Sequence, residues 1–221
     1  MTKVICIIPA RSGSKGIKNK NIIIFNNKPL IYYSISFAKK LKFIDEIIFS
    51  TDSQKYLRIA QKYYNFKNDL RSKKFSKNNS KAVDYVKHEL KKINNLKKFK
   101  FLLLLQPTSP FRIKKNFEKA YRMLKNNECD TVISSKLVKE HPLLMHKYAN
   151  KVKYISKNYR TAFTGRQNYP QIYLRQGAMY FTKISTIFKT NSLQGGRVKH
   201  IEVKGKYRID IDDNEDMVLT N

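Results

Sequence analysis

A short apolar segment that runs directly into a small, cationic loop is the feature that most restricts how this chain can fold. Val4–Pro9 is apolar, and Ala10–Gly16 follows as Ala-Arg-Ser-Gly-Ser-Lys-Gly. A buried strand that opens into such a loop is typical of α/β proteins that hold an anion, because small residues let backbone N–H groups reach phosphate oxygens while Arg and Lys neutralise charge. An ordinary strand-to-helix turn with solvated cations is the alternative, and these residues alone leave both open. The loop lacks the Gly-Lys-Ser/Thr of a P-loop and the Gly-x-Gly-x-x-Gly of dinucleotide-binding proteins.

Apolar runs alternate with helical patterns along most of the chain, which is typical of a mostly parallel sheet with helices on both faces. The predicted strands are Val4–Ile8, Glu46–Ser50, Lys100–Leu105, Thr131–Ser135, Gly177–Thr182, Lys199–Val203 and Arg208–Asp212. The predicted helices are Pro29–Lys40, Gln54–Tyr64 (capped by Thr51–Ser53), Val83–Ile93 and Lys114–Asn126. The predicted fold class is therefore α/β, with a doubly wound, mostly parallel sheet.

Residues 137–173 interrupt this alternation, because Tyr, Lys and Asn alternate loosely there and predict a β-rich excursion. No linker or repeat divides the chain, so we predict one domain over residues 1–221 with 137–173 as an excursion within it. No apolar run approaches the ~20 residues of a membrane span, and the first apolar run is too short for a signal peptide. Two cysteines, Cys6 and Cys129, make no disulfide scaffold. We expect a cytoplasmic protein that does not contact membranes.

The formal net charge of +30 is weak guidance to function. Such a charge is often the mark of a nucleic-acid-binding protein. Here the cations are mostly Lys, spread along the whole chain among many Asn and Ile, and no recognised nucleic-acid-binding motif accompanies them. We therefore expect no nucleic-acid partner, although the positive electrostatic field of the protein would attract anionic substrates.

Acidic residues gather at one place in this basic chain. Residues 210–216 hold five of its sixteen acids: Asp210, Asp212, Asp213, Glu215 and Asp216. Asp210 and Asp212 are two apart on a predicted strand, so their side chains leave the same face, and two carboxylates on one face suit Mg²⁺. The alternative is a helix N-terminus, where the last three acids would interact with the dipole of a short final helix. Both can hold together.

Two polar segments are candidates for binding. Gln106 follows a buried strand in Leu103–Arg112, which places it at the carboxyl edge of a sheet, where α/β proteins bind ligands; a solvated turn is the alternative. Arg71 and Ser80 lie in the loop Leu70–Ser80, which by itself is typical of a solvated basic loop.

Several segments together resemble the acylneuraminate cytidylyltransferases (CMP-N-acetylneuraminic acid synthetases). The resembling segments are Ile8–Asn21, Leu70–Ser80, Leu103–Arg112, Gly165–Pro170 and Ile209–Asp216. The resemblance implies a Rossmann-like nucleotidyltransferase fold with an inserted dimerisation arm, a homodimer, and Mg²⁺ as cofactor. It also implies an activity in which CTP reacts with a nonulosonic (nine-carbon, sialic-acid-like) 2-keto sugar acid to give the CMP-sugar and pyrophosphate.

The resemblance also implies roles for individual residues. Lys20, Arg11 and Asp212 would be catalytic, with Lys20 near the α-phosphate. CTP would be held by Arg11, Ser14, Lys15, Asn21, Arg71 and Ser80. The sugar acid would contact Gln106, Arg166 and Gln176, and Mg²⁺ would be held by Asp210 and Asp212.

The chain departs from the family in one segment that bears on the sugar. Where the family usually reads Asn-Gly-Ala, this chain has Gln176-Gly177-Ala178 after Arg175, so the resemblance does not say which nonulosonic acid is used. Two alternatives stay open. One is a cytidylyltransferase for an eight-carbon sugar acid, whose opening motif differs after Pro-Ala-Arg. The other is a non-catalytic basic module that binds nucleotide or RNA, which would not need the pair Asp210 and Asp212.

Overall fold

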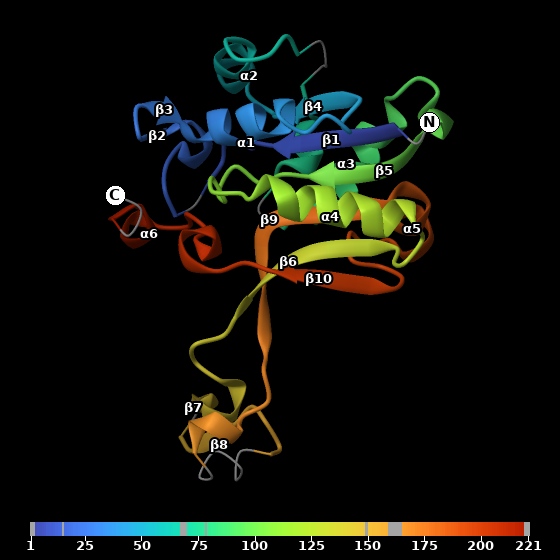
Figure 1. The fold of residues 1–221 in the computed structure, drawn as a ribbon. Helices are drawn as coiled ribbons and strands as arrows, with labels where there is room; N and C mark the ends of the chain where they lie inside the picture. The colour runs from blue at the N-terminus through green and yellow to red at the C-terminus, as the bar shows by residue number, and fades with distance from the viewer. Residues whose placement is uncertain are drawn as a thin grey trace.

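A six-stranded sheet forms the centre of the molecule in the computed structural model (Figure 1). The structure describes residues 3–14, 16–66, 70–77, 79–148, 150–158 and 165–218. Within these ranges the strand order is β10-β6-β9-β5-β1-β4. The strands are β1 (Lys3–Pro9), β4 (Glu46–Ser50), β5 (Phe99–Leu104), β6 (Thr131–Leu137), β9 (Tyr173–Lys183) and β10 (Val198–Glu202). A small separate pair is formed by β2 (Ile24–Phe25) and β3 (Lys28–Pro29).

The sheet is mostly parallel, as predicted. β1 pairs in parallel with β4 and β5, and β6 pairs in parallel with β10. β9 is antiparallel to both β5 and β6 and joins the two parallel groups. Because β9 runs the opposite way, its first residues lie beside the carboxyl ends of its neighbours, and this brings the segment around residue 177 to the edge where β5 ends.

Helices cover both faces of the sheet, so the doubly wound prediction is confirmed. On one face α1 (Leu30–Lys39), α2 (Gln54–Gln61) and α4 (Lys114–Lys125) pack on alternate residues of β1, including Val4, Cys6 and Ile8. On the other face α3 (Ala82–Lys91) and α5 (Ile184–Thr190) pack on Ile5 and Ile7. A strand covered on both faces reads as a continuous apolar run, which is why the opening segment shows no polar alternation.

Local signals at helix ends explain several boundaries. Ser53 Oγ accepts a hydrogen bond from Tyr56 N at 3.3 Å, so the predicted cap of α2 is confirmed. The short last helix, α6 (Asn214–Val218), begins where Asp213 Oδ1 accepts from Asp216 N at 3.0 Å, while Asp216 Oδ2 accepts from Asp212 N at 2.8 Å. The alternative given above for the last acids, a helix N-terminus, therefore holds for this part of the cluster.

One prediction about secondary structure was wrong, and one helix was missed. Residues Arg208–Asp212 do not form a strand: a 3-10 helix over Gly205–Arg208 is followed by an unpaired extended segment, tied to the turn after β5 by a 2.7 Å bond from Ile211 N to Thr108 O. The extended backbone still places alternate side chains on opposite faces. Ile211 is fully buried against Phe25 and Leu30, whereas Asp210 and Asp212 face the other way, into a cavity. The helix α5 was not predicted, because seven residues directly after a strand give little helical periodicity.

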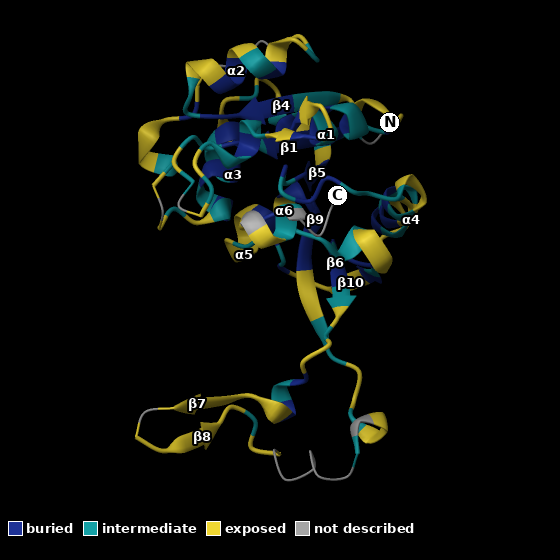
Figure 2. Cartoon of the chain, turned by 90° about the vertical axis from the view of Figure 1, so that its left-hand side faces the viewer, coloured by how far each residue is buried: buried dark blue, intermediate teal, exposed yellow. Residues whose placement is uncertain are grey.

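The excursion forms an arm that extends away from the sheet (Figure 1). It leaves at the end of β6, returns at the start of β9, and carries the hairpin of β7 (His146–Tyr148) and β8 (Val152–Tyr154). Its surface is largely exposed (Figure 2), and it presents apolar side chains to solvent, with Tyr148 76% exposed and Ile155 57% exposed. Among the described residues, no helix is both long and apolar enough to cross a membrane.

Candidate functional site

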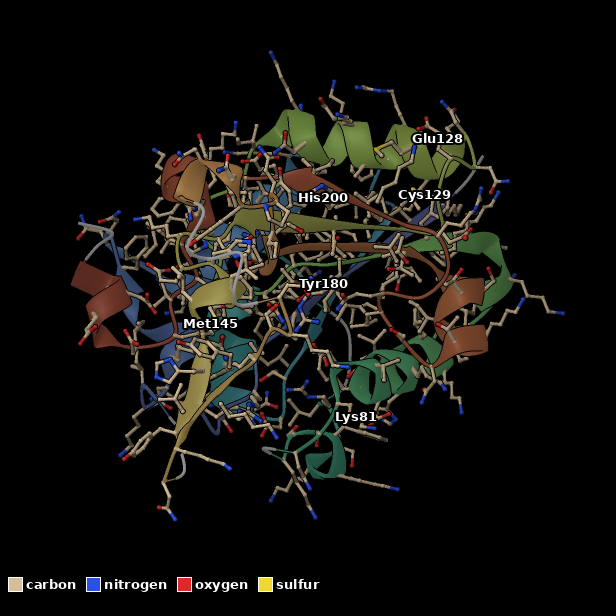
Figure 3. The ribbon with its side chains drawn as sticks, turned by 90° about the horizontal axis from the view of Figure 1, so that it is seen from below. Lys81, Glu128, Cys129, Met145, Tyr180 and His200 are labelled. Carbon is tan, nitrogen blue, oxygen red and sulfur yellow. The ribbon has the colours of Figure 1, made fainter. Side chains whose placement is uncertain are left out.

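A cavity of about 650 Å³ opens at the carboxyl ends of β1 and β5, the edge where α/β sheets bind ligands. It brings together most of the predicted site residues: Arg11, Ser14, Lys20, Asn21, Arg71, Ser80, Gln106, Asp210 and Asp212. Other lining residues to which the sequence gave no role are Phe75, Lys77, Tyr85, Arg175 and Tyr180. In the view from below, Tyr180 lies toward the middle of the molecule, between the labels of His200 and Lys81 (Figure 3).

The loop after β1 is held in place by the ends of two other segments. Asp52, directly after β4, accepts from Ser12 N at 2.8 Å and from Ser12 Oγ at 3.1 Å. Asn21 is buried and donates from Nδ2 to the Arg11 carbonyl at 3.0 Å. The loop is therefore fixed with Arg11 and Ser14 on the cavity wall. Lys15 lies outside the described residues, so its predicted contact stays a prediction.

Lys20 and Asp212 face each other across the mouth of the cavity. Lys20 Nζ lies 2.7 Å from Asp212 Oδ1, and the side chains are 16% and 72% exposed. The backbone of Asp212 also packs against Gly16, where a Cβ would lie 2.8 Å from the Asp212 carbonyl oxygen. Gly16 thus allows the acidic segment to approach the cationic loop.

Asp210 is the enclosed member of the acidic pair. Its Oδ1 accepts from Ser109 Oγ and, at 3.0 Å, from Gln176 Nε2, and its Oδ2 accepts from Gly177 N at 3.2 Å. Burial raises the pKa of the Asp210 carboxyl, while the bonds from Ser109 and Gly177 act in the opposite direction. Two carboxylates on one cavity wall are a donor set that suits a hard cation with further water or phosphate ligands. No cluster of three or more His, Cys, Asp or Glu side chains that could hold a metal occurs within the part of the chain the structure describes.

Arg71 is buried, not solvated. Its side chain is 3% exposed and its guanidinium carbon lies 4.7 Å from the centre of the Tyr85 ring. Nε and Nη2 of Arg71 are buried and have no hydrogen-bond partner among the described residues. Burial lowers the pKa of Arg71, and the Tyr85 ring partly offsets this. Two unpaired donors of a buried guanidinium at a cavity wall are a site for a ligand with two neighbouring acceptors.

Of the residues predicted to contact the sugar acid, Gln176 does not line this cavity. Gln176 is fully buried behind the wall, because its amide bonds Asp210 on one side and Ser134 Oγ and Ala178 N on the other. Arg166 begins a 3-10 helix on the arm, and its side chain lies outside what the structure describes. Gln106 does line the cavity, with its carbonyl fixed by Arg112 Nη2 at 2.6 Å.

The residues that the sequence did not reveal come from helices and strands whose patterns indicate only a core. Tyr85 lies on the buried face of α3, and Tyr180 lies on a buried stretch of β9. A residue that packs in the core and a residue that lines the cavity occur at the same apolar spacing, so the sequence pattern does not distinguish them. Phe75 follows Arg71 in the loop whose basic composition suggested a solvated surface. An aromatic residue within a basic loop, Phe75, was the sequence signal that could have indicated that this loop lines the site.

Fold and site together define an α/β protein with a cationic, carboxylate-bearing cavity at the carboxyl edge of its sheet. A family model described as Cytidylyltransferase matches residues 5–214. The chain therefore belongs to the cytidylyltransferase family, and the predicted resemblance is confirmed.

Two relatives with named activities are similar to this chain over most of its length. The chain is 29% identical to the N-acylneuraminate cytidylyltransferase of Streptococcus agalactiae serotype V over 98% of this chain and 52% of that protein. It is 30% identical to the pseudaminic acid cytidylyltransferase of Campylobacter jejuni (strain 81-176) over 81% of this chain and 78% of that protein. The chain spans about half the length of the first of these relatives.

Two solved structures share the fold. A CMP:2-keto-3-deoxy-manno-octonic acid synthetase solved with CTP matches with a TM-score of 0.69 and 14% identity, covering 99% of this chain and 98% of that one. A 4-diphosphocytidyl-2C-methyl-D-erythritol synthase from Anaerococcus prevotii matches with a TM-score of 0.70 and 17% identity, covering 100% of this chain and 97% of that one.

Proposed function

We propose that this chain transfers the cytidylyl group of CTP to the anomeric hydroxyl of a nonulosonic 2-keto sugar acid. The sugar oxygen forms a bond to the α-phosphorus, the bond from that phosphorus to the bridging oxygen breaks, pyrophosphate leaves, and the hydroxyl proton passes to water. Family membership supports the reaction class, and the names of the two relatives, N-acylneuraminate and pseudaminic acid cytidylyltransferase, support the acceptor class.

The unpaired guanidinium edge of Arg71 is the observation that carries the proposal. Cytosine presents two neighbouring acceptors, O2 and N3, which match the two free donors Nε and Nη2. Uracil presents an N–H donor in place of the second acceptor, so the same edge disfavours UTP. The stack on Tyr85 holds the guanidinium in one plane, and Ser80 and Phe75 line the same part of the cavity.

The phosphates would lie toward the loop after β1. Arg11, Ser14 and Lys15 would neutralise and position the triphosphate, and Asn21 fixes the loop through the Arg11 carbonyl. Lys20 would approach the α-phosphate and stabilise the charge that develops in the transition state. Phosphoryl and nucleotidyl transfers depend mainly on positioning and charge stabilisation, which agrees with a cavity rich in cations.

Asp210 and Asp212 are the residues that would hold Mg²⁺, since each places a carboxylate on the cavity wall. When bound, the ion supplies neutralisation of phosphate charge and a template for the leaving pyrophosphate. Asp212 is mostly exposed and already paired with Lys20, so it can exchange partners as ligands enter. Asp210 is enclosed and held by three donors.

The acceptor would occupy the side of the cavity formed by the lining residues Gln106 and Arg175. We further propose a homodimer in which the arm contacts a second copy and brings Arg166 toward the partner's acceptor. The exposed apolar side chains of the arm support this, because contiguous exposed apolar surface is typical of an interface. Sedimentation at micromolar concentration should then give twice the mass of the chain.

The test is pyrophosphate release from CTP and Mg²⁺ with a panel of sugar acids, which includes sialic, legionaminic and pseudaminic acids and one eight-carbon 2-keto acid. Release with a nine-carbon acid supports the proposal, and release with the eight-carbon acid alone would overturn the acceptor class. If CTP does not bind, the proposed function is overturned. If RNA binds with steep salt dependence and no turnover occurs, the basic-module alternative stands.

A further inference from the structure

The wall behind Asp210 is built around an irregularity in the pairing of β6 and β9. Ile133 pairs with Tyr180, but the next residue of β6, Ser134, pairs with Gln176. Three residues of β9, Gly177 to Met179, therefore have no partner on β6, and the first of them, Gly177, lines the cavity. Bulges of this kind re-aim side chains next to functional sites.

Buried polar groups close the bulge. Ser134 Oγ accepts from Met179 N at 3.0 Å and lies 2.8 Å from the Gln176 carbonyl oxygen, to which it donates. Gln176 Oε1 accepts from Ala178 N at 2.9 Å and lies 3.0 Å from Ser134 Oγ. Both side chains are at most 1% exposed, so the bulge is a fixed part of the fold.

The remaining end of the Gln176 amide points out of the bulge, at Asp210. Its Nε2 donates to Asp210 Oδ1 at 3.0 Å, beside the donors Ser109 Oγ and Gly177 N. The amide has one orientation, because Oε1 must face the Ala178 N–H and Nε2 must face the carboxylate. No apolar or shorter side chain can make both contacts.

Gly177 completes this arrangement. A Cβ at Gly177 would collide with Gln106 Oε1 and would lie 3.0 Å from Ser109 Oγ and 3.2 Å from Asp210 Oδ1. The bulge therefore brings backbone to within hydrogen-bond distance of Asp210, and the amide behind it fixes the carboxylate from a second side.

We infer that Gln176 is a positioning residue that orients Asp210 for the divalent cation, and is not a contact to the acceptor. The inference rests on the proposed function, because it takes Asp210 as a metal ligand. Groups that orient metal ligands typically change metal affinity or activity by roughly 10- to 100-fold when they are removed. Gln176 does not line the cavity and reaches it only through its hydrogen bond to the cavity-lining Asp210 and through the bulge.

The experiment compares Gln176→Met with Ser134→Ala. Methionine has nearly the volume of glutamine and lacks both amide contacts, whereas Ser134→Ala weakens the bulge and leaves the donor to Asp210. Electron paramagnetic resonance measures the binding of Mn²⁺ to the protein–CTP complex. No sugar acid is added, so the metal site is tested without turnover. CTP binding in EDTA and thermal unfolding are measured in parallel.

We expect Gln176→Met to weaken Mn²⁺ binding at least tenfold, with CTP binding in EDTA changed less than threefold. Ser134→Ala should change Mn²⁺ binding less than threefold at a similar loss of thermal stability. Equal weakening in both variants, or unchanged Mn²⁺ binding in Gln176→Met, would overturn the inference. A wild-type protein that binds CTP and Mn²⁺ but transfers to no acceptor would overturn the proposed function and leave this inference standing.

Discussion

Replacing Arg71 by methionine separates a ligand-binding arginine from a structural one. The guanidinium is buried, and its Nε and Nη2 have no partner among the described residues. If these donors serve the cytosine base, the substitution removes binding energy while it removes no hydrogen bond made by those two atoms within the chain. We therefore expect CTP affinity to fall and the stability of the ligand-free protein to stay nearly constant.

The size of the effect follows from two charge-assisted hydrogen bonds. Each contributes about 1.5–3 kcal/mol when one partner is charged, which gives an upper range of about 3–6 kcal/mol for the pair. Water entering the vacated space solvates the base edge and recovers part of this, so we expect a loss of about 2–3 kcal/mol, or a roughly 30- to 150-fold higher Kd. Unfolding free energy without ligand should change by less than about 1 kcal/mol, since the lost stack on Tyr85 is offset by removing a buried unpaired cation.

Arg112 is the matched control, because it is the same residue type and its Nε and Nη2 both donate within the chain, while its buried Nη1 has no partner among the described residues. Its Nη2 donates to the Gln106 carbonyl at 2.6 Å and its Nε donates to the Ala178 carbonyl at 3.3 Å. Arg112→Met leaves two acceptors unpaired, at about 1–3 kcal/mol each, so its unfolding free energy should fall by about 2–5 kcal/mol. Burial lowers the pKa of Arg112 to about 10, so it stays charged at neutral pH.

Calorimetric titration of CTP and UTP, with denaturant unfolding in parallel, measures both quantities. The wild type should prefer CTP, and Arg71→Met should lose most of that preference. A variant at Arg71 that unfolds as readily as Arg112→Met and still binds CTP with wild-type affinity would refute the argument, because Arg71 would then be a structural cation.

Four further outcomes follow from the site and from two ion pairs outside it, which Asp130 forms with Lys183 and Arg197. Asp212→Ala should keep the fold, since the side chain is 72% exposed, and lose turnover; activity retained at saturating Mg²⁺ would contradict its assignment. Lys20→Ala should lower kcat by roughly 100-fold or more with little change in CTP affinity, as expected for a charge that acts in the transition state; a change in KM alone would contradict this. Gly177→Ala should lower kcat at least tenfold while circular dichroism stays native, because a Cβ would displace the flexible Gln106 side chain, a proposed acceptor contact, without disturbing the backbone. Asp130→Asn should lower stability at pH 7 by about 2 kcal/mol. Lys183 and Arg197 hold the pKa of Asp130 below its usual range. The difference in stability between the wild type and Asp130→Asn is therefore present above about pH 4 and should shrink as the pH falls below that value. A stability difference that does not depend on pH would exclude the ion pairs as its cause.

The sheet could be predicted because its signals are local. The apolar runs that became β1, β4 and β5 lie between helices whose spacing is regular, and Ser53 marks the start of α2 in the sequence itself. The segment 208–212 shows the limit of such reasoning. Alternation of acidic and apolar residues predicts an extended backbone with two faces, and the structure has such a backbone there. Alternation does not say whether a neighbouring strand is present to form hydrogen bonds with it.

The burial of Arg71 could not be predicted, because it depends on contacts distant in the chain. Its backbone N bonds the Thr51 carbonyl at 2.7 Å, which ties the loop to the end of β4, and its side chain meets a tyrosine from α3. Neither contact leaves a pattern in a loop of Lys, Ser and Asn. The role of Gln176 was hidden for a similar reason, since its partners Ser134 and Asp210 come from two other segments of the chain.

The antiparallel direction of β9 explains why an arm and a cavity can share one edge of the sheet. Because β9 runs against β5 and β6, its first residue, Tyr173, pairs with Leu137 at the carboxyl end of β6, and Tyr180, further along, pairs with Leu104 at the carboxyl end of β5. The arm therefore leaves and returns within a few residues of the bulge that supports Asp210. Arg112 joins the turn after β5 to the same bulge through the carbonyls of Gln106 and Ala178. In the proposed homodimer, a second copy that fixes the arm would act on β9 a few residues from the carboxylate, so a variant that prevents this proposed association should weaken divalent-cation binding as well as acceptor binding.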